Sequence, residues 1–198
     1  MSQRPVPNRG LCLLLSLVLW AAAGTSTAAP ALKAGVFEPA RQAPDFVLRG
    51  SDGAEFRLGS HRGKVVLLFF GFSHCAEVCP VTLATLAQAR KALGSDGAAV
   101  QVVYVTVDPE RDTPQMMKTY LAAFDATFLG ATGEPDAMAA LRKNYGVVAN
   151  KVATGSGTVF DHSSSIFMID REGRLRAMMP YGRSAKDFVH DIRLLLAP

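Results

Sequence analysis

The sequence predicts an α/β domain with a central mixed sheet flanked by helices. Two continuous apolar runs, Lys64–Phe70 and Ala99–Val107, are typical of strands buried on both faces of a sheet. A helical pattern of apolar residues follows the first run, and a turn that leads into a helix follows the second. Strands that alternate with helices favour a mostly parallel sheet with helices on both faces. The turn signature Asp170-Arg-Glu-Gly173 adds an antiparallel hairpin near the C-terminus.

Local signals set the order of the elements. Short alternating segments on either side of Ser51-Asp-Gly53 predict an N-terminal β-hairpin. Pro80 suits the first turn of a helix that ends at Gly94, and Thr113 with Pro114 marks the start of the next helix. The later predicted elements are a short strand at Thr127–Leu129, a helix at Pro135–Tyr145, a hairpin or loop insertion at Gly146–Thr158, strands at Ser165–Ile169 and Leu175–Met179, and a helix at Ser184–Leu196. This order outlines a thioredoxin-like fold with an N-terminal β-hairpin extension and a hairpin insertion.

The N-terminus has the composition of a secretory signal. Arg4 and Arg9 precede the apolar run Leu11–Ala23, and small residues with a candidate cleavage site at Ser26-Thr-Ala28 follow. The run is shorter than the roughly twenty residues of a membrane span. No charge occurs between Arg9 and Lys33, however, so the segment also fits an uncleaved anchor.

Three regions follow from these patterns. Residues 1–30 are predicted to be a signal peptide or an N-terminal membrane anchor, residues 31–44 a linker without periodicity, and residues 45–198 one thioredoxin-like domain. The folded part is therefore expected outside the cytoplasm, in the bacterial periplasm. If the N-terminal segment is not cleaved, it would anchor this part to the inner membrane.

Charge and composition exclude two classes of protein. The chain carries 21 basic and 17 acidic residues, and two of the bases lie in the N-terminal segment, so residues 31–198 have a net charge of only +2. This charge is too small for the strongly basic surface that binds nucleic acid, so nucleic acid is not an expected partner. A hydrophobic content of 49% suffices for one core but is too low for a protein with many membrane spans.

Two cysteines lie where the first buried strand meets a helix. Cys75 and Cys79 flank Ala-Glu-Val, and Pro80 follows. Backbone N–H groups and the positive end of a helix dipole at such a junction favour the thiolate, which attacks disulfides and binds metals. A disulfide across so short a loop would restrict the unfolded chain little, so a purely structural bridge is a poor explanation. Because Cys12 lies in the N-terminal apolar run, the domain has no other cysteine, and we predict a reactive or metal-binding pair.

Histidines are the candidates for a further ligand. Structural zinc normally takes four protein ligands, whereas Cu(I) accepts two thiolates and one imidazole. His61 lies in a turn and His190 on the last helix, where solvated side chains are expected. His74 adjoins Cys75 and could tune its pKa. His162 stands just before a buried strand, and its spacing alone leaves its role open.

Three separated stretches resemble the Sco/SenC family of copper chaperones, which have a thioredoxin fold and serve assembly of the copper centre of cytochrome c oxidase. They are Phe70-Gly-Phe-Ser-His-Cys-Ala-Glu-Val-Cys-Pro80, Val107-Asp-Pro-Glu-Arg-Asp-Thr-Pro114 and Phe160-Asp-His-Ser-Ser164. The resemblance covers roughly residues 40–195. Ala76 and Glu77 stand where the family usually has Pro and Asp, a departure expected to alter loop stiffness and partner contacts.

The resemblance implies a site and its cofactor. Cys75, Cys79 and His162 would be the ligands of a copper ion, and Asp108 would lie close to them. Asp161 would orient the His162 ring without contacting the copper itself. The protein would then be a metallochaperone and not an enzyme. It would bind Cu(I) or Cu(II), dock on the copper-bearing subunit of cytochrome c oxidase and hand the ion over by ligand exchange. Other periplasmic copper carriers or thiol reductants would be further partners.

A dedicated thiol–disulfide oxidoreductase is the alternative. The redox-active pair Cys75 and Cys79 would then reduce cysteines of a copper-accepting partner. Broad oxidoreductases of this fold have a proline just ahead of the strand that faces the thiols, whereas this chain has Asp161–Ser165 there, and the nearest preceding proline is Pro135. This difference argues against general disulfide exchange. A peroxiredoxin is disfavoured because Ala76 replaces the threonine that precedes the reactive cysteine in that family.

Overall fold

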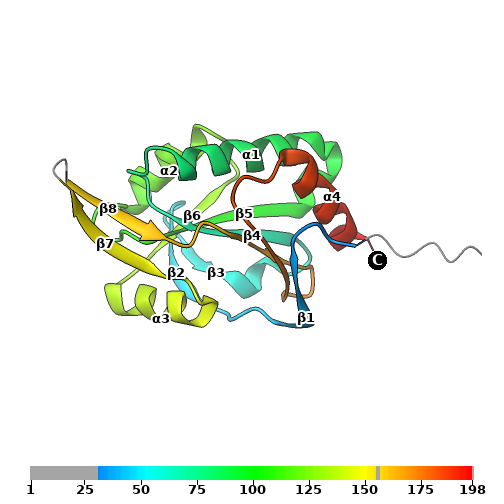
Figure 1. Cartoon of the computed structure of the whole chain (residues 1–198), viewed down its shortest axis with the longest axis horizontal. Coiled ribbons are helices and arrows are strands. Elements are labelled where there is room, and N and C mark those ends of the chain that lie inside the picture. Colours follow the sequence, from blue (N-terminus) through cyan, green and yellow to red (C-terminus); the bar gives the residue numbers. More distant parts are fainter. Residues whose placement is uncertain (1–30, 155–156, 198) are drawn as a thin grey trace, which may run out of the picture.

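An eight-stranded mixed sheet forms the centre of the protein, as the computed structural model shows for residues 31–154 and 157–197 (Figure 1). The strand order is β1-β10-β9-β4-β5-β6-β2-β3, in which β4, β5 and β6 are parallel and the other pairings are antiparallel. The strands of this sheet are β1 (Gly35–Gln42), β2 (Val47–Gly50), β3 (Glu55–Arg57), β4 (Val65–Gly71), β5 (Val100–Thr106), β6 (Leu129–Thr132), β9 (Ile166–Ile169) and β10 (Arg174–Met179).

Helices cover both faces of this sheet, as predicted. They are α1 (Val78–Ala92), α2 (Pro114–Ala122), α3 (Pro135–Tyr145) and α4 (Ala185–Leu196), with short 3-10 turns at Leu58–His61 and Gly94–Ala99. All seven residues of β4 are buried, and their side chains alternate between the two faces. Leu67 and Phe69 belong to the core cluster under α1, α2 and α4, whereas Leu68 and Phe70 belong to the cluster that α3 covers. The central strands therefore carry a hydrophobic core on each side, and the thioredoxin-like architecture follows.

The predicted hairpin insertion is confirmed. Strands β7 (Ala149–Thr154) and β8 (Gly157–His162) pair antiparallel in a separate two-stranded sheet, which projects from the body of the domain in Figure 1. The register pairs Ala149 with His162, so the end of β8 returns the chain to the main sheet. The N-terminal hairpin of β2 and β3 is also present, with Leu48 opposite Phe56.

Two predictions about elements need correction. The expected linker over residues 31–44 contains β1, which pairs with β10 at the sheet edge. Most side chains of β1 are exposed, so the strand depends on backbone pairing that leaves no apolar pattern in the sequence. The strand expected at Thr127–Leu129 is displaced to Leu129–Thr132. The Asp125 carboxylate accepts hydrogen bonds from the Thr127 backbone N–H at 2.9 Å and its hydroxyl at 2.7 Å, which forms a turn where the strand was expected.

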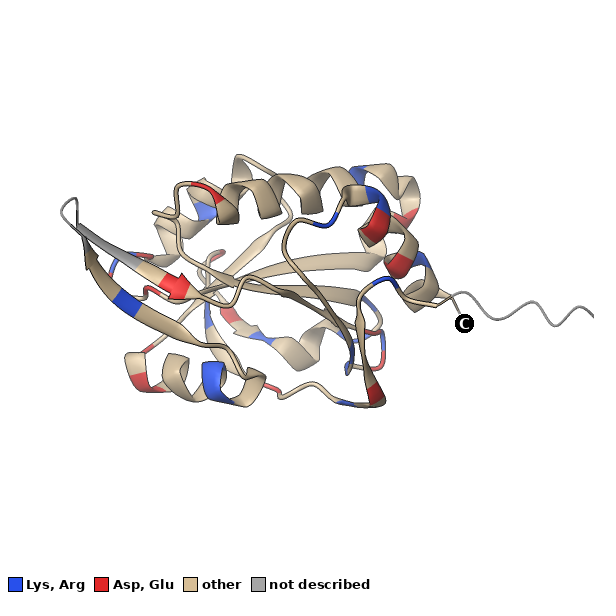
Figure 2. Ribbon diagram, viewed as in Figure 1, with Lys and Arg blue, Asp and Glu red and all other residues tan. Residues whose placement is uncertain are grey.

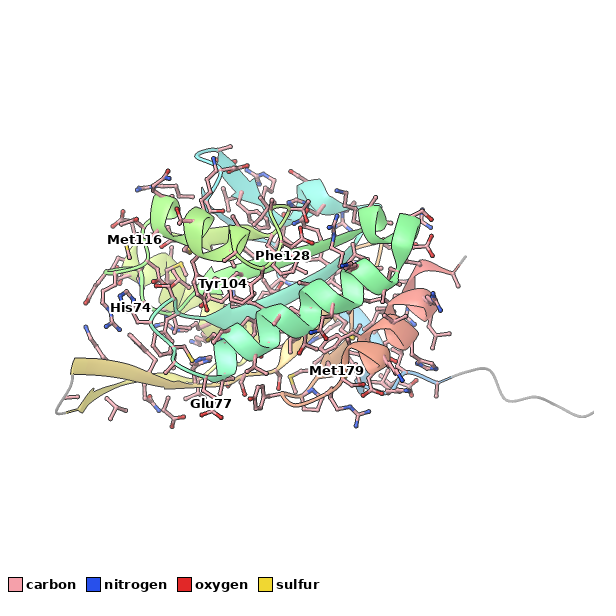
Figure 3. The ribbon with its side chains drawn as sticks, turned by 90° about the horizontal axis from the view of Figure 1, so that it is seen from above. His74, Glu77, Tyr104, Met116, Phe128 and Met179 are labelled. Carbon is pink, nitrogen blue, oxygen red and sulfur yellow. The ribbon has the colours of Figure 1, made fainter. Side chains whose placement is uncertain are left out.

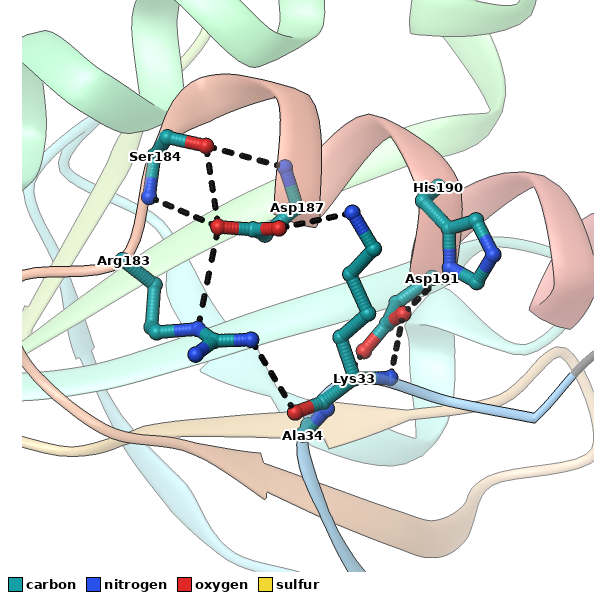
Figure 4. Close-up of polar contacts among 7 residues, drawn as sticks. All are labelled: Lys33, Ala34, Arg183, Ser184, Asp187, His190 and Asp191. Carbon is teal, nitrogen blue, oxygen red and sulfur yellow. Dashed lines mark hydrogen bonds and ion pairs between the residues drawn. The ribbon is translucent and has the colours of Figure 1, made fainter.

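Two aspartates fasten the N-terminal end of the domain to α4 (Figure 4). Asp191 is fully buried and accepts hydrogen bonds from the backbone N–H groups of Lys33 at 2.8 Å and Ala34 at 2.9 Å. Asp187 accepts one from the Lys33 ammonium at 2.8 Å and completes a capping box with Ser184. The residues that precede β1 are thus part of the folded domain.

Charges of both signs are interspersed over the helices, and α4 carries both (Figure 2). Among residues 31–154 and 157–197, no helix has the length and apolar character needed to cross a membrane. The predicted signal peptide or anchor at residues 1–30 lies outside the described residues and remains a prediction.

Candidate metal and redox site

The two cysteines lie at the junction of β4 and α1. A turn closed by a hydrogen bond of 3.1 Å from the Cys75 N–H to the Phe72 carbonyl follows β4, and α1 begins at Val78. Cys79 is therefore in the first helical turn and is completely buried, whereas Cys75 lies in the preceding loop and is partly exposed. The Cys79 N–H points at the Cys75 sulfur at 3.4 Å, and both cysteines are free thiols. The helix start thus directs a backbone donor at a thiol, as the sequence indicated.

His162 approaches this pair from the far end of β8. Its Nε2 lies 3.9 Å from the Cys79 sulfur, and its ring packs edge-on against Phe72 with the ring centres 5.8 Å apart. Its Nδ1 lies 2.9 Å from the Ser163 carbonyl oxygen. Because a carbonyl can only accept, Nδ1 carries a proton, and in the neutral ring Nε2 is the nitrogen whose lone pair faces the sulfur. The hairpin therefore brings together two side chains that are 83 residues apart.

The other two predicted site residues, Asp108 and Asp161, have contacts of their own in the structure. Asp108 is buried, but its carboxylate pairs with the Arg111 guanidinium, and its backbone N–H donates to the Thr106 hydroxyl at 2.8 Å. Asp161 is exposed on β8, opposite Asn150. The group that holds the His162 ring is the Ser163 carbonyl, which takes the orienting place that was expected for Asp161. The interactions found among the described residues include none that joins either aspartate to the thiols or to the imidazole.

The other histidines do not reach the thiols through any contact found in the described part of the chain. His74 is exposed on the loop that leads into α1, with its Nδ1 3.0 Å from the Ser73 hydroxyl (Figure 3). His61 stacks on Phe56 with the ring centres 5.0 Å apart, and His190 contacts Asp191. His162 is thus the histidine that the fold brings to Cys79.

Asp112 belongs to an Asp-Thr-Pro turn that the sequence leaves open as an acid near the site or as part of a helix start, and its carboxylate contacts the loop that carries Cys75. The carboxylate is fully buried and accepts hydrogen bonds from the Ser73 N–H at 3.0 Å, from the Ser73 hydroxyl, and from the Thr106 hydroxyl at 2.6 Å. It thereby ties the loop that carries Cys75 to the end of β5. The Asp-Thr-Pro turn predicts a helix start, which is correct for Thr113, but a capping pattern gives no sign of this long-range contact.

Gly71 and Tyr104 line the buried side of the pair. A Cβ placed on Gly71 would lie 2.9 Å from the Cys79 sulfur and 2.9 Å from the Tyr104 hydroxyl oxygen, so only glycine leaves room for both. Tyr104 is completely buried, and in the view from above it lies between α1 and α2 (Figure 3). Its ring contacts Phe69 and Tyr120, with centre separations of 5.7 and 6.1 Å. The inner thiol therefore sits in a tightly packed, largely aromatic environment.

Burial makes the stability of the reduced protein sensitive to alkaline pH. Burial raises the pKa of the Cys79 thiol from 9.0 to about 12, and it also raises the pKa values of Tyr104 and Tyr145. The folded-state pKa values exceed the unfolded ones, so these groups stabilise the fold fully below the unfolded pKa and lose that contribution as the pH rises. We expect the free energy of unfolding to fall above about pH 9, by up to about 1.4 kcal/mol per pH unit for each group.

Urea unfolding between about pH 8 and pH 11 measures this slope. Cys79→Ala should retain the contribution of the tyrosines and show a shallower decline than the wild type. Parallel curves for the two proteins would contradict the assignment of this effect to Cys79.

The fold and the site define a class: a thioredoxin-like protein with a dithiol at a helix start and a histidine beside it. The sequence profile of the SCO1/SenC family matches residues 36–197. The chain therefore belongs to the SCO1/SenC family, as the three sequence stretches predicted.

Individual relatives agree with this assignment. The mitochondrial SCO2 homolog of Mus musculus is 34% identical over 157 residues, which cover 77% of this chain and 62% of the relative. ScoI of Bradyrhizobium japonicum, solved with copper bound, is 35% identical with a TM-score of 0.73 over 78% of this chain and 99% of that one. Apo Sco1 of Thermus thermophilus is 34% identical with a TM-score of 0.75 over 84% and 98% of the two chains. The chain spans about six-tenths of the length of the mammalian relatives.

Proposed function

We propose that this protein is a copper metallochaperone that binds Cu(I) or Cu(II) through Cys75, Cys79 and His162 and assists assembly of the copper centre of cytochrome c oxidase. The observation that carries the proposal is the approach of the His162 Nε2 to 3.9 Å from the Cys79 sulfur. Copper bound to ScoI of Bradyrhizobium japonicum and to yeast Sco1 supports it. Docking on the copper-bearing oxidase subunit and a periplasmic location belong to the same proposal.

The donor geometry fits one shared ion. Thiolate and imidazole ligands lie about 2.3 and 2.0 Å from a first-row metal such as zinc, so two such donors on one ion stand at most about 4.3 Å apart. The separation of 3.9 Å between the Cys79 sulfur and the His162 Nε2 is within this limit. The described residues contain no group of three or more His, Cys, Asp and Glu donors already placed to hold a metal ion. Cys75 is the third proposed donor, and its sulfur lies on the loop beside Cys79, 3.4 Å from the Cys79 backbone nitrogen.

The chain's own groups supply binding and release. Two thiols and an imidazole are soft to intermediate donors that suit copper. Both thiols must lose their protons to ligate, and the Ser163 carbonyl keeps the His162 lone pair on Nε2. Copper affinity should therefore fall in acid, and an acceptor with equally soft ligands can take the ion by ligand exchange. No bond of a substrate is made or broken, so we propose no enzymatic reaction for this role.

Replacement of His162 tests the proposal. His162→Ala in the full chain should lower the affinity for Cu(I) at least about tenfold, equivalent to about 1.4 kcal/mol, because two thiolates alone remain. A competition titration with a chromophoric Cu(I) chelator measures the affinity. His74→Ala is the matched control, since that exposed histidine adjoins Cys75 and should leave the affinity unchanged. An unchanged affinity in His162→Ala would overturn the three-ligand site.

The unequal exposure of the two thiols favours a second candidate function. Cys75 is partly exposed and Cys79 buried, an arrangement in which one thiolate attacks and the other resolves. Cys75 would attack a disulfide of a copper-accepting partner, and Cys79 would displace the partner from the mixed disulfide. The partner gains two thiols, and this protein gains the Cys75–Cys79 disulfide. Efficient reduction of such a partner by copper-free His162→Ala protein would favour this dedicated oxidoreductase over the chaperone.

A further inference from the structure

Two tyrosine hydroxyls beside the dithiol lack a hydrogen-bond partner. Among the described residues, three buried side-chain atoms are unpartnered, namely the hydroxyl oxygens of Tyr104 and Tyr120 and the Nε of Arg90. Tyr104 is completely buried on β5, so water cannot replace the missing partner from the surface. A buried hydroxyl without a partner costs free energy, and such groups in native proteins usually have a reason.

The Tyr104 hydroxyl borders the Cys79 sulfur. Both atoms lie 2.9 Å from the position that a Cβ on Gly71 would occupy, and thus adjoin the same small space. If the Cys79 sulfur is a thiolate, it can accept a hydrogen bond from this unpartnered hydroxyl.

We propose that Tyr104 is a positioning residue whose hydroxyl donates a hydrogen bond to the Cys79 sulfur when that sulfur is a metal-bound thiolate. The inference rests on the proposed copper site. Metal ligation removes the proton from the thiol, and a thiolate is a far better acceptor than a neutral thiol. The hydroxyl is therefore unsatisfied in the empty protein and satisfied in the loaded one. This difference favours the loaded state, because a group can shift an equilibrium only by interacting unequally with its two sides.

Tyr104→Phe in the full chain tests this role. We expect the affinity for Cu(I) to fall about tenfold, as measured by chelator competition, while the urea midpoint of the copper-free, reduced protein stays unchanged or rises. With Cu(II), the sulfur-to-copper charge-transfer band should move to lower energy, because the sulfur loses a hydrogen bond and becomes a stronger electron donor. Packing alone would not produce this combination.

Tyr145→Phe is the matched control. Its hydroxyl is already satisfied by a hydrogen bond of 2.8 Å to the Pro44 carbonyl oxygen, and its ring lies in the core cluster on the opposite face of the sheet. This variant should lower the urea midpoint and leave copper affinity unchanged. An unchanged copper affinity in Tyr104→Phe, or a fall in its copper-free midpoint as large as that of Tyr145→Phe, would overturn the inference.

A double-mutant cycle with His162→Ala separates this inference from the proposed function. Should His162→Ala leave copper affinity intact, the three-ligand site fails. A tenfold loss on adding Tyr104→Phe to that variant would still support the donor role at Cys79. Conversely, if His162→Ala weakens copper binding and Tyr104→Phe does not, the result supports the proposed copper site and contradicts the proposed role of Tyr104.

Discussion

Cys79→Ser is expected to lower the affinity for Cu(I) at least about 1000-fold, equivalent to about 4 kcal/mol. The substitution exchanges a soft sulfur for a hard hydroxyl oxygen that stays protonated at neutral pH, and it removes the donor that faces His162. The loss should exceed that of His162→Ala, because a thiolate contributes both charge and softness to the site. Chelator competition with the full, reduced chain measures it.

Thr82→Ser is the control for this variant. Thr82 lies one helical turn further along α1, is buried, and donates from its hydroxyl to the Val78 carbonyl oxygen at 2.8 Å. Serine keeps that donor, so the control should bind copper like the wild type. Cys75→Ser should lose copper affinity to a similar extent, with less effect on stability because Cys75 is partly exposed. Retention of wild-type affinity by Cys79→Ser would show that the buried thiol is not a ligand.

Asp112→Ala should lower the free energy of unfolding by about 3–4 kcal/mol. Hydrogen bonds to a charged group contribute about 1.5–3 kcal/mol each, and removal of this one acceptor leaves several buried donors without a partner. The carboxylate accepts from the N–H and hydroxyl of Ser73 and from the Thr106 hydroxyl, and none of its surface is exposed. Chemical unfolding of the metal-free protein measures the loss. Because Ser73 lies two residues before Cys75, copper affinity should fall as well.

Asp96→Ala provides the comparison. Asp96 is an exposed carboxylate in the turn after α1, and its removal should change stability by no more than about 0.5 kcal/mol. The loss of stability in Asp112→Asn should be intermediate. The amide keeps one acceptor oxygen, but its NH2 group places two N–H donors where the carboxylate accepted hydrogen bonds. A loss in Asp112→Ala as small as that in Asp96→Ala would contradict the role of the buried carboxylate.

Elements with strong local signals were predicted well from sequence. The apolar run of β4 and the capped start of α2 at Thr113 are in place, and α3 spans the predicted Pro135–Tyr145. Strand β1 was missed because an edge strand with exposed side chains has no apolar period, and its pairing with β10 is a contact of distant segments. Local patterns report local structure, whereas edge pairing depends on the completed sheet.

The same distinction applies to the site. Sequence alone determined that Cys75 and Cys79 lie at a strand-to-helix junction, because both the apolar run and the helix start are local features. Family resemblance assigned His162, but only the tertiary structure decided how it meets the pair: the β7–β8 hairpin carries Nε2 to 3.9 Å from the Cys79 sulfur. Tertiary structure likewise decided that the Ser163 carbonyl orients the ring and that Asp112 holds the cysteine loop. The contacts of His162 with Cys79 and of Asp112 with Ser73 join segments that are far apart in the chain, arise from packing and have no sequence period. The Ser163 carbonyl is adjacent to His162 in the sequence, but the conformation that turns it towards the ring is set by the fold.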